Sequence, residues 1–257
     1  MSCIEHNIDE LLAMKKYPSK LFYEGNLELL EKKKISIVGT RKPSKYTKQM
    51  VFHLSQKLSL NDICVVSGGA MGVDALAHSG AKSSNTIAVL PCGIDLKYPA
   101  VNKNLLVDIE QNGLLLSQFE MGFKATPWSF VVRNELVVAL GDVLVVAEAE
   151  LNSGSMRSVE FALEMGKQIF VLPHRLGESG ATQKLLEDGK ATCIYSLDSF
   201  VENFSEKTLH VKQLDEFEKF CSTNPIYDEV LKKFPQRFFE AELNGDVKVV
   251  DGRVFLV

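Results

Sequence analysis

Residues Val65 to Asp74 read Val-Val-Ser-Gly-Gly-Ala-Met-Gly-Val-Asp, and this segment gives the clearest indication of the fold class. An apolar run, 63–66, ends there in a turn of small residues, and Val73 and Leu76 after the turn have the spacing of a helix face. This order of strand, turn and helix is typical of an anion site, because glycines allow close approach and the N–H groups of the first helical turn point at the ligand. The alternative is a tight turn whose glycines serve only the packing of helix on strand.

The same alternation of strand and helix runs through most of the chain. Further buried strands are expected at 35–38, 86–90, 114–117, 143–147, 169–172 and 192–194. Helices are expected at 46–60, after the glycine turn, and at 102–111, 130–140, 152–165 and 182–188. Continuous apolar strands separated by helices indicate a parallel sheet covered on both faces. The sequence therefore predicts an α/β, Rossmann-like domain over 31–203, preceded by a lead-in segment over 1–30 that packs on it.

The chain beyond residue 203 predicts a second, smaller domain. A polar linker is expected at 204–213. Over 214–257, helical patterns containing Phe217 and Cys221, covering 227–234 and covering 236–243 precede two short strands, 247–250 and 253–256. Asn244-Gly245 is a helix-stop signal, and Asp251-Gly252 is a hairpin turn. Three helices and a hairpin predict a winged helix. Because its third helix sets Arg237 against Glu240 and Glu242, we expect a structural or protein-contacting role rather than DNA reading.

Composition excludes several classes of protein. The 257 residues are 46% hydrophobic and 24% charged, which suits a globular protein with a large core. The five cysteines are scattered and never form a Cys-x-x-Cys pair, so neither a disulfide framework nor a zinc site is indicated. No leader-like segment and no apolar run of about 20 residues is found. We therefore expect a cytoplasmic protein with no membrane partner, no metal and no cofactor.

Charge is distributed unevenly. The net charge is −4, yet residues 31–57 hold eight basic side chains and a single acid, Glu31. Such a run favours a polyanionic partner. An ordinary solvated face is the alternative.

Ligands of parallel α/β sheets bind beyond the carboxyl ends of the strands. The loops expected at that edge combine cations, glycine amides, hydroxyl groups and aromatic rings, as single-stranded nucleic-acid sites do. The predicted binding residues are Gly39, Arg41, Lys42, Lys45, Ser67, Gly68, Gly69, Gly72, Trp128, Phe130, Arg133, Asn134, Ser153 and Ser155.

Individual residues have competing interpretations. Arg41 follows a strand and is expected to contact phosphate rather than to form a structural ion pair. Arg133 is expected near the first turn of a helix, where a cation opposes the helix dipole, so a nearby anion would explain it. Asp74 and His78 lie one helical turn apart and favour local or core hydrogen bonds over half of a metal site. Trp128, expected in a loop, suits a buried lid and a base-stacking platform equally.

Several ordered motifs resemble the DprA/Smf family. They are 37–44, 67–74 with His78, 86–93 with Asp95, Tyr98 and Pro99, 133–134 and 153–156. The resemblance implies a non-catalytic, homodimeric protein that binds single-stranded DNA and loads the RecA recombinase during natural transformation. It also implies that Arg41 contacts phosphate, that Gly68, Gly69 and Gly72 form a cradle of backbone amides, and that Phe130 stacks on a base.

This chain departs from the family's pattern at two positions and in one module. Glu135 stands where the family usually has arginine, and Thr40 replaces a smaller residue. An N-terminal helical module of longer members is not expected here.

Two enzymatic alternatives share the architecture. Nucleotide or nucleoside-monophosphate hydrolases resembling cytokinin-activating phosphoribohydrolases carry a Pro-Gly-Gly-x-Gly-Thr motif, which neither 91–93 nor 152–154 supplies. A dinucleotide oxidoreductase is less favoured, because Ser67 occupies the first position of the Gly-x-Gly-x-x-Gly pattern and no acid stands at the tip of the next strand to hold a ribose.

Overall fold

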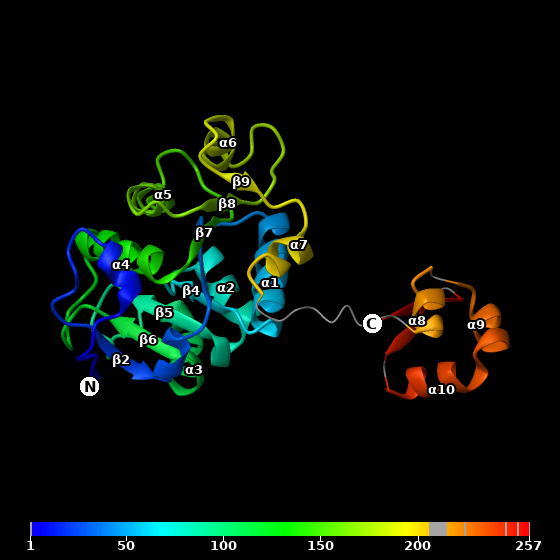
Figure 1. The fold of residues 1–257 in the computed structure, drawn as a ribbon. Coiled ribbons are helices and arrows are strands. Elements are labelled where there is room, and N and C mark those ends of the chain that lie inside the picture. Colours follow the sequence, from blue (N-terminus) through cyan, green and yellow to red (C-terminus); the bar gives the residue numbers. More distant parts are fainter. Residues whose placement is uncertain (1, 206–214, 224, 245, 251, 257) are drawn as a thin grey trace. The chain divides into compact units, whose positions relative to one another are not determined.

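The computed structural model describes residues 2–205, 215–223, 225–244, 246–250 and 252–256. They belong to two compact units, 1–206 and 207–257, which are described separately (Figure 1). The linker predicted at 204–213 lies outside the described residues, except for Phe204 and Ser205.

The first unit is built on one large sheet. In the described part of the chain it has nine strands in the order β1-β2-β6-β5-β4-β3-β7-β8-β9. The strands are β1 Ser2–Cys3, β2 Phe22–Gly25, β3 Lys34–Val38, β4 Cys64–Ser67, β5 Thr86–Leu90, β6 Leu114–Ser117, β7 Val143–Val146, β8 Ile169–Val171 and β9 Thr192–Cys193. All neighbours from β6 to β9 are parallel. The predicted α/β fold with a parallel sheet is confirmed.

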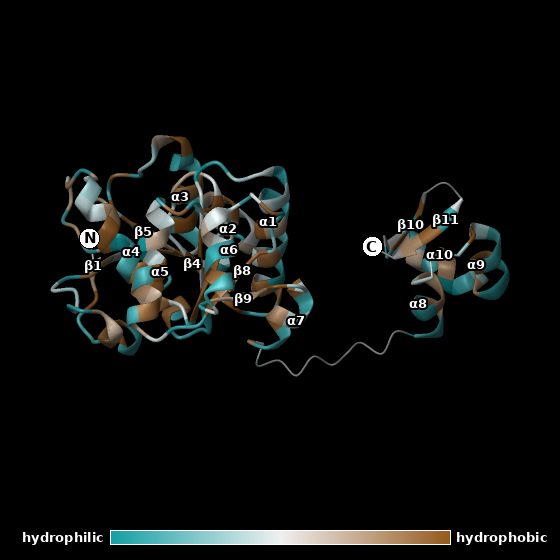
Figure 2. Ribbon diagram, turned by 90° about the horizontal axis from the view of Figure 1, so that it is seen from above, coloured by the Kyte–Doolittle hydropathy of each residue, from teal (hydrophilic) through white to brown (hydrophobic). Residues whose placement is uncertain are grey.

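Helices cover both faces of this sheet. The α-helices are α1 Lys45–Leu60, α2 Val73–Ala81, α3 Lys103–Asn112, α4 Pro127–Leu140, α5 Gly154–Glu164, α6 Gly180–Glu187 and α7 Leu197–Glu202, and short 3-10 turns are η1 Asp9–Ala13, η2 Leu27–Leu30, η3 Ser83–Asn85 and η4 Ala100–Asn102. Ile35 and Ile37 of β3 lie in the core under α1, α2 and α7. Val38 of the same strand lies in the core under α4, α5 and α6. Successive side chains of a strand point to opposite faces of the sheet, so a strand with apolar residues at successive positions buries both faces. Figure 2 shows the hydropathy of the strands and of the helices that cover them.

The predicted lead-in segment contributes strands to this sheet. β2 pairs antiparallel with β6, with Phe22 opposite Ser117 and Gly25 opposite Leu114. β1 pairs with β2 in turn. Leu11 of η1 is fully buried against the α4 side of the sheet.

Helix α4 begins earlier than predicted. The Thr126 side chain accepts from the Ser129 N–H and Ser129 Oγ accepts from the Thr126 N–H, which forms a capping box, and Pro127 occupies the first helical turn. Proline suits this position, where an amide hydrogen would have no helical partner. The expected loop position of Trp128 is therefore wrong, because Trp128 lies in the first turn of α4. Arg133 lies in the second turn.

Strand order places a switch point beside β3. From β3 the chain continues to β4, β5 and β6, each farther from β3 in the sheet. Helix α4 then connects β6 to β7, which pairs with the other side of β3. The loops that leave β3 and β7 diverge there, which opens a crevice at the carboxyl edge.

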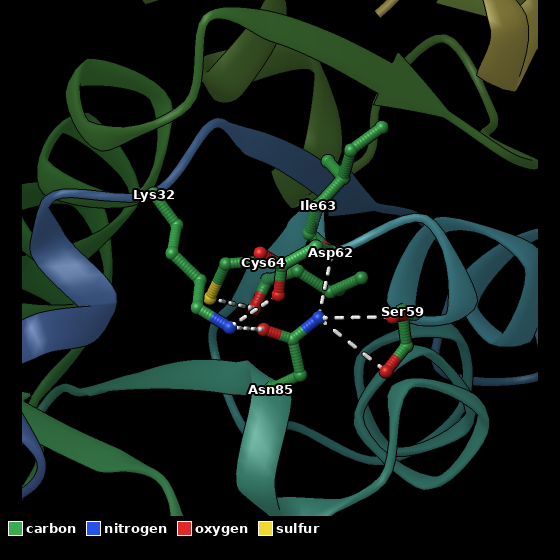
Figure 3. Close-up of polar contacts among 7 residues, drawn as sticks. Lys32, Ser59, Asp62, Ile63, Cys64 and Asn85 are labelled. Atoms are coloured by element: carbon green, nitrogen blue, oxygen red, sulfur yellow. Dashed lines mark hydrogen bonds and ion pairs between the residues drawn. The ribbon is translucent and has the colours of Figure 1, made fainter. Parts of the chain in front are cut away.

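Two lysines of the basic run 31–57 make polar contacts at the amino ends of the strands, away from the crevice at the carboxyl ends. Lys32 Nζ lies 2.6 Å from Asp62 Oδ1 and 3.0 Å from Asn85 Oδ1, and Asn85 Nδ2 donates to the Ile63 carbonyl (Figure 3). Buried Lys34 pairs with Glu10 at 2.6 Å. Lys32 precedes β3 and Lys34 is its first residue, so both lie at the amino end of this strand. The interpretation of the whole run as a polyanion signal is therefore wrong for them.

The second unit contains helices α8 Glu216–Cys221, α9 Tyr227–Lys233 and α10 Pro235–Asn244 and an antiparallel hairpin of β10 Val247–Val250 and β11 Arg253–Leu256. Its core includes Phe217, Val230 and Phe238. Arg237 Nε lies 3.5 Å from Asp215 Oδ2. The elements fall where the sequence predicts them, and the winged-helix assignment stays a prediction. Gly245 and Asp251, named in the sequence analysis, lie outside the described residues, as does position 214, where the predicted second domain begins.

No helix in the described ranges of either unit has the length and apolar character needed to cross a bilayer.

Candidate nucleic-acid interface

A hollow of about 390 Å³ opens at the switch point. Its walls come from the end of β3 and the following loop, the start of α2, the middle of α4 and the first turns of α5. The lining residues are Val38, Gly39, Thr40, Arg41, Lys42, Ala70, Asp74, Phe130, Arg133, Asn134, Val137, Ser153, Gly154, Ser155 and Ser158.

The hollow brings together eight of the residues predicted from sequence. They are Gly39, Arg41, Lys42, Phe130, Arg133, Asn134, Ser153 and Ser155. Gly68 lines a smaller hollow of about 20 Å³ that shares Arg41, Phe130 and Arg133 with the first. The remaining predicted residues, Lys45, Ser67, Gly69, Gly72 and Trp128, line neither.

Arg41 and Phe130 form one wall. The Arg41 guanidinium carbon lies 5.4 Å from the centre of the Phe130 ring, which is cation–π distance. Tyr98 meets the same ring edge-on, with centroids 5.9 Å apart. Arg41 is exposed, and the described chain supplies it with this ring contact and no ion pair. A solvent-facing cation beside an aromatic ring can contact a phosphate while a base stacks nearby.

Arg133 is held differently. Its guanidinium lies 3.5 Å from Asp74 Oδ2, and the two side chains are only 5% and 9% exposed. The anion predicted beside Arg133 is therefore the protein's own carboxylate. The dipole argument does not apply, because Arg133 lies in the second turn of α4. Burial raises the pKa of Asp74 above its ordinary value, although the guanidinium opposes this, and burial lowers the pKa of Arg133.

The glycine turn is packed by protein groups. A β-carbon at Gly68 would overlap the Arg133 guanidinium and lie 2.8 Å from Asp74 Oδ2. Gly72 has φ +81°, and a β-carbon there would lie 2.7 Å from the Arg41 Cα. The Ala70 N–H donates to Asp74 Oδ2 at 3.3 Å. These contacts correspond to the packing alternative of the sequence analysis, and the amide cradle stays a prediction.

Glu148, which follows β7, fixes the loop that carries Arg41. Its main-chain carbonyl accepts from Thr40 at 2.8 Å, and its carboxylate accepts from the Ser44 N–H at 3.0 Å. Burial alone would raise the pKa of this carboxyl, but hydrogen bonds from Thr47 and Ser44 hold it below its ordinary value. The loops after β3 and β7 are thus tied together at the crevice.

The first turns of α5 form another part of the wall. Ser153 occupies the N-cap position, yet its side chain makes no capping hydrogen bond. Ser153 Oγ and Ser158 Oγ are buried without a hydrogen-bond partner. Asn134 Nδ2 reaches this turn from α4 and donates to the Gly154 carbonyl at 3.4 Å. The first turns of α5 therefore bring unpartnered hydroxyl groups to the wall of the hollow.

His78 lies in the core. Its Nδ1 is 2.7 Å from Thr86 Oγ1, and because that hydroxyl donates to the Val65 carbonyl, Nδ1 carries the hydrogen and donates. Burial lowers the pKa of His78 to about 3. The core hydrogen bond expected for His78 is confirmed. Across the described ranges, no group of three or more His, Cys, Asp or Glu side chains could hold a metal ion.

Trp128 and Lys45 lie outside the hollow. Trp128 is 62% exposed and meets Phe119 edge-on at 5.8 Å, and Phe119 stacks on Phe123 at 4.5 Å. Of the two interpretations of Trp128, the buried lid is wrong. Lys45 is exposed at the start of α1.

Comparison with known proteins identifies the family. The model of DNA recombination-mediator protein A matches residues 5–205. The chain belongs to this family. The fold agrees with two solved structures: DNA processing protein A from Helicobacter pylori, 41% identical with a TM-score of 0.77 over 79% of this chain and 94% of that one, and the Streptococcus pneumoniae protein, 35% identical with a TM-score of 0.71 over 76% and 70%. The Helicobacter pylori study describes a single-stranded DNA binding mode.

Curated relatives in the family are DNA processing proteins. DprA of Streptococcus pneumoniae is 37% identical over 67% of this chain, and DprA of Bacillus subtilis is 33% identical over 75%. These alignments span 62% and 66% of the relatives, so the chain matches under two thirds of their length. The resemblance inferred from sequence motifs is confirmed.

Sequence reasoning missed two features of the site. Asp74 is expected from the sequence to make a local or core hydrogen bond, whereas in the structure it pairs with Arg133 of helix α4. Ser158 was not considered, although it stands one turn after Ser155 in a helix that opens at the carboxyl edge. That spacing was the available signal.

Proposed function

We propose that the chain binds single-stranded DNA in the hollow, protects incoming strands and loads the RecA recombinase during natural transformation. It acts in the cytoplasm as a homodimer, without catalysing a reaction and without a cofactor. Membership of a recombination-mediator family and the single-stranded DNA bound by the Helicobacter pylori relative support this proposal.

The observation that carries the proposal is the position of Arg41. This cation faces solvent, lies over the Phe130 ring and lines the same hollow as the α5 N-terminus. A cation, a stacking surface and a helix N-terminus are complementary to a phosphate, a base and a second phosphate oxygen. Lys42 adds positive charge to the wall of the hollow, whereas Glu135 does not line it. Since Glu135 Oε1 accepts from the Lys15 N–H at 3.0 Å, that carboxylate is directed at the N-terminal segment.

The proposal for the remaining predicted contacts follows the same pattern. Lys45 and Trp128 would guide the strand outside the hollow. Asn134, Ser153 and Ser155 would hold its backbone within it. Ser67, Gly68, Gly69 and Gly72 would shape the neighbouring wall.

The test is a fluorescence-anisotropy titration of labelled oligothymidine and of the matching duplex at 50 and 200 mM salt. We expect wild type to prefer the single strand. Arg41→Ala should weaken binding about tenfold or more and reduce the slope of log K against log salt by about 0.7, because one phosphate contact is lost. Lys32→Ala, which removes a cation at the opposite edge of the sheet, is the matched control and should leave the slope unchanged. Equal effects of the two variants would contradict the proposed site.

The hydrolase alternative is tested with the same protein. Asp74, the acid on which such chemistry would depend, is buried and paired with Arg133. We therefore expect no release of base or phosphate from nucleotides. Turnover that disappears in Asp74→Asn would instead establish the enzyme.

A further inference from the structure

We infer that the hollow accommodates a single nucleotide, and that a free nucleoside monophosphate binds there and competes with the strand. This deepens the proposed function, on which it rests for the location of the site. It adds a small-molecule ligand class that strand binding alone does not require.

The volume of the hollow indicates how many nucleotides it can hold. Its volume of about 390 Å³ lies near the lower end of the range of roughly 300–1,000 Å³ for small-molecule sites. One phosphate, one sugar and one base suit such a volume, so neighbouring nucleotides of a strand must lie outside. Most contacts of the hollow are then available to a nucleotide that has no neighbours.

Unpartnered polar atoms gather in this hollow. The described chain has five buried side-chain polar atoms without a hydrogen-bond partner, and Arg133 Nε, Ser153 Oγ and Ser158 Oγ belong to residues that line it. Ser158 is 1% exposed and Arg133 is 4% exposed. A buried polar group without a hydrogen-bond partner is destabilising. Buried donors left unsatisfied at one place indicate a ligand with several acceptor oxygens.

The α5 N-terminus identifies those oxygens as phosphate. Helix α5 has 11 residues; the Met156 N–H donates to the Ser153 carbonyl at 3.1 Å, and the N–H groups of Gly154 and Ser155 precede any helical acceptor. Ser153 leaves them uncapped and keeps its own hydroxyl available. A phosphate placed here would accept from these amides and from the hydroxyl groups of Ser153 and Ser158, in the favourable field of the helix.

The other wall suits the nucleoside. Phe130 presents a ring for stacking, with Arg41 over it, and Val38 and Val137 add apolar surface. An inorganic phosphate would leave this wall uncovered, and a nucleoside would leave the hydroxyl groups of α5 unsatisfied. A nucleoside monophosphate engages both walls.

The test is calorimetric titration of the full chain with thymidine monophosphate, thymidine and inorganic phosphate, and displacement of labelled oligothymidine by each. We expect the monophosphate to bind at least tenfold more tightly than either fragment and to displace the oligomer. Ser158→Ala should lower the affinity for thymidine monophosphate about tenfold, because a hydrogen bond to the charged phosphate is lost. Ser55→Ala is the matched control, because Ser55 Oγ is also buried and unpartnered but lies outside the hollow. It should leave binding unchanged.

A second variant separates binding from folding. Because Ser153 makes no capping bond, Ser153→Ala removes a hydroxyl without loss of a cap, and we expect the same weakening. If oligothymidine binds and the monophosphate does not, this inference fails and the proposed function stands. If the monophosphate binds and oligothymidine does not, the proposed function fails. An unchanged affinity in both folded serine variants would overturn the assignment of the phosphate to α5.

Discussion

Replacement of Gly68 by alanine tests how the hollow is held. The φ angle of Gly68 is not in the left-handed region, so the backbone itself tolerates alanine. The new methyl group would occupy the space of the Arg133 guanidinium, which would have to leave Asp74. Breaking a buried ion pair costs about 3–5 kcal/mol, and the smaller entropy of the unfolded alanine chain returns about 0.4–1 kcal/mol. We expect a net loss of about 2–4 kcal/mol in the free energy of unfolding.

The assay is urea unfolding followed by tryptophan fluorescence. The chain has one tryptophan, Trp128, which lies in the first unit, so the signal reports that unit. Gly154→Ala is the matched control, because no heavy atom lies within 4 Å of its added β-carbon and its φ is not positive. We expect that variant to remain within about 0.5 kcal/mol of wild type.

A double-mutant cycle separates steric overlap from other effects. Arg133→Met removes the guanidinium, so Gly68→Ala should cost less than about 1 kcal/mol in that background, a coupling of about 2–3 kcal/mol. Additive losses would refute the steric argument. They would mean that the glycine is required for a reason unrelated to the buried pair.

Two further predictions concern stability. The pKa of folded His78, about 3, lies below its unfolded value of about 6.5, so its contribution is present above pH 6.5 and is lost as pH falls toward 3. As pH falls from 6 to 4, the free energy of unfolding of wild type should therefore decrease by about 1.4 kcal/mol more per pH unit than that of His78→Asn. Parallel plots of unfolding free energy against pH for the two proteins would contradict this. Thr126→Ala removes the N-cap of α4 and should cost about 1 kcal/mol in urea unfolding, whereas Thr223→Ala, in the second unit, should leave the tryptophan transition unchanged. Equal midpoints for wild type and Thr126→Ala would show that the cap contributes nothing.

Local signals predicted the elements well. The strand expected at 114–117 agrees with β6, and the helix expected at 46–60 begins one residue earlier in α1. Apolar runs and helical periodicity are properties of neighbouring residues, so the sequence alone reveals them. The start of α4 was missed for a local reason too, because Thr126-Pro127 is a cap followed by a helix-compatible proline and was interpreted as a loop.

Long-range pairings were beyond such signals. Nothing near Arg133 in sequence indicates that Asp74 neutralises it, since the two meet only when α2 and α4 pack. The basic run was misleading for the same reason. Lys32 and Arg41 are close in sequence, but they lie at opposite ends of strand β3. Lys32 pairs with Asp62 at the amino end, and Arg41 lines the hollow at the carboxyl end.

The strand that the first residues add to the sheet has a consequence for any shortened form of this protein. A fragment starting at residue 31 would lack β2, and β6 would become an edge whose Leu114–Ser117 backbone groups lie open. Exposed edges of apolar strands recruit strands from other molecules and favour aggregation. Residues 1–30 therefore cover the backbone of β6 and oppose intermolecular strand pairing. A fragment made for crystallography or binding studies should retain them.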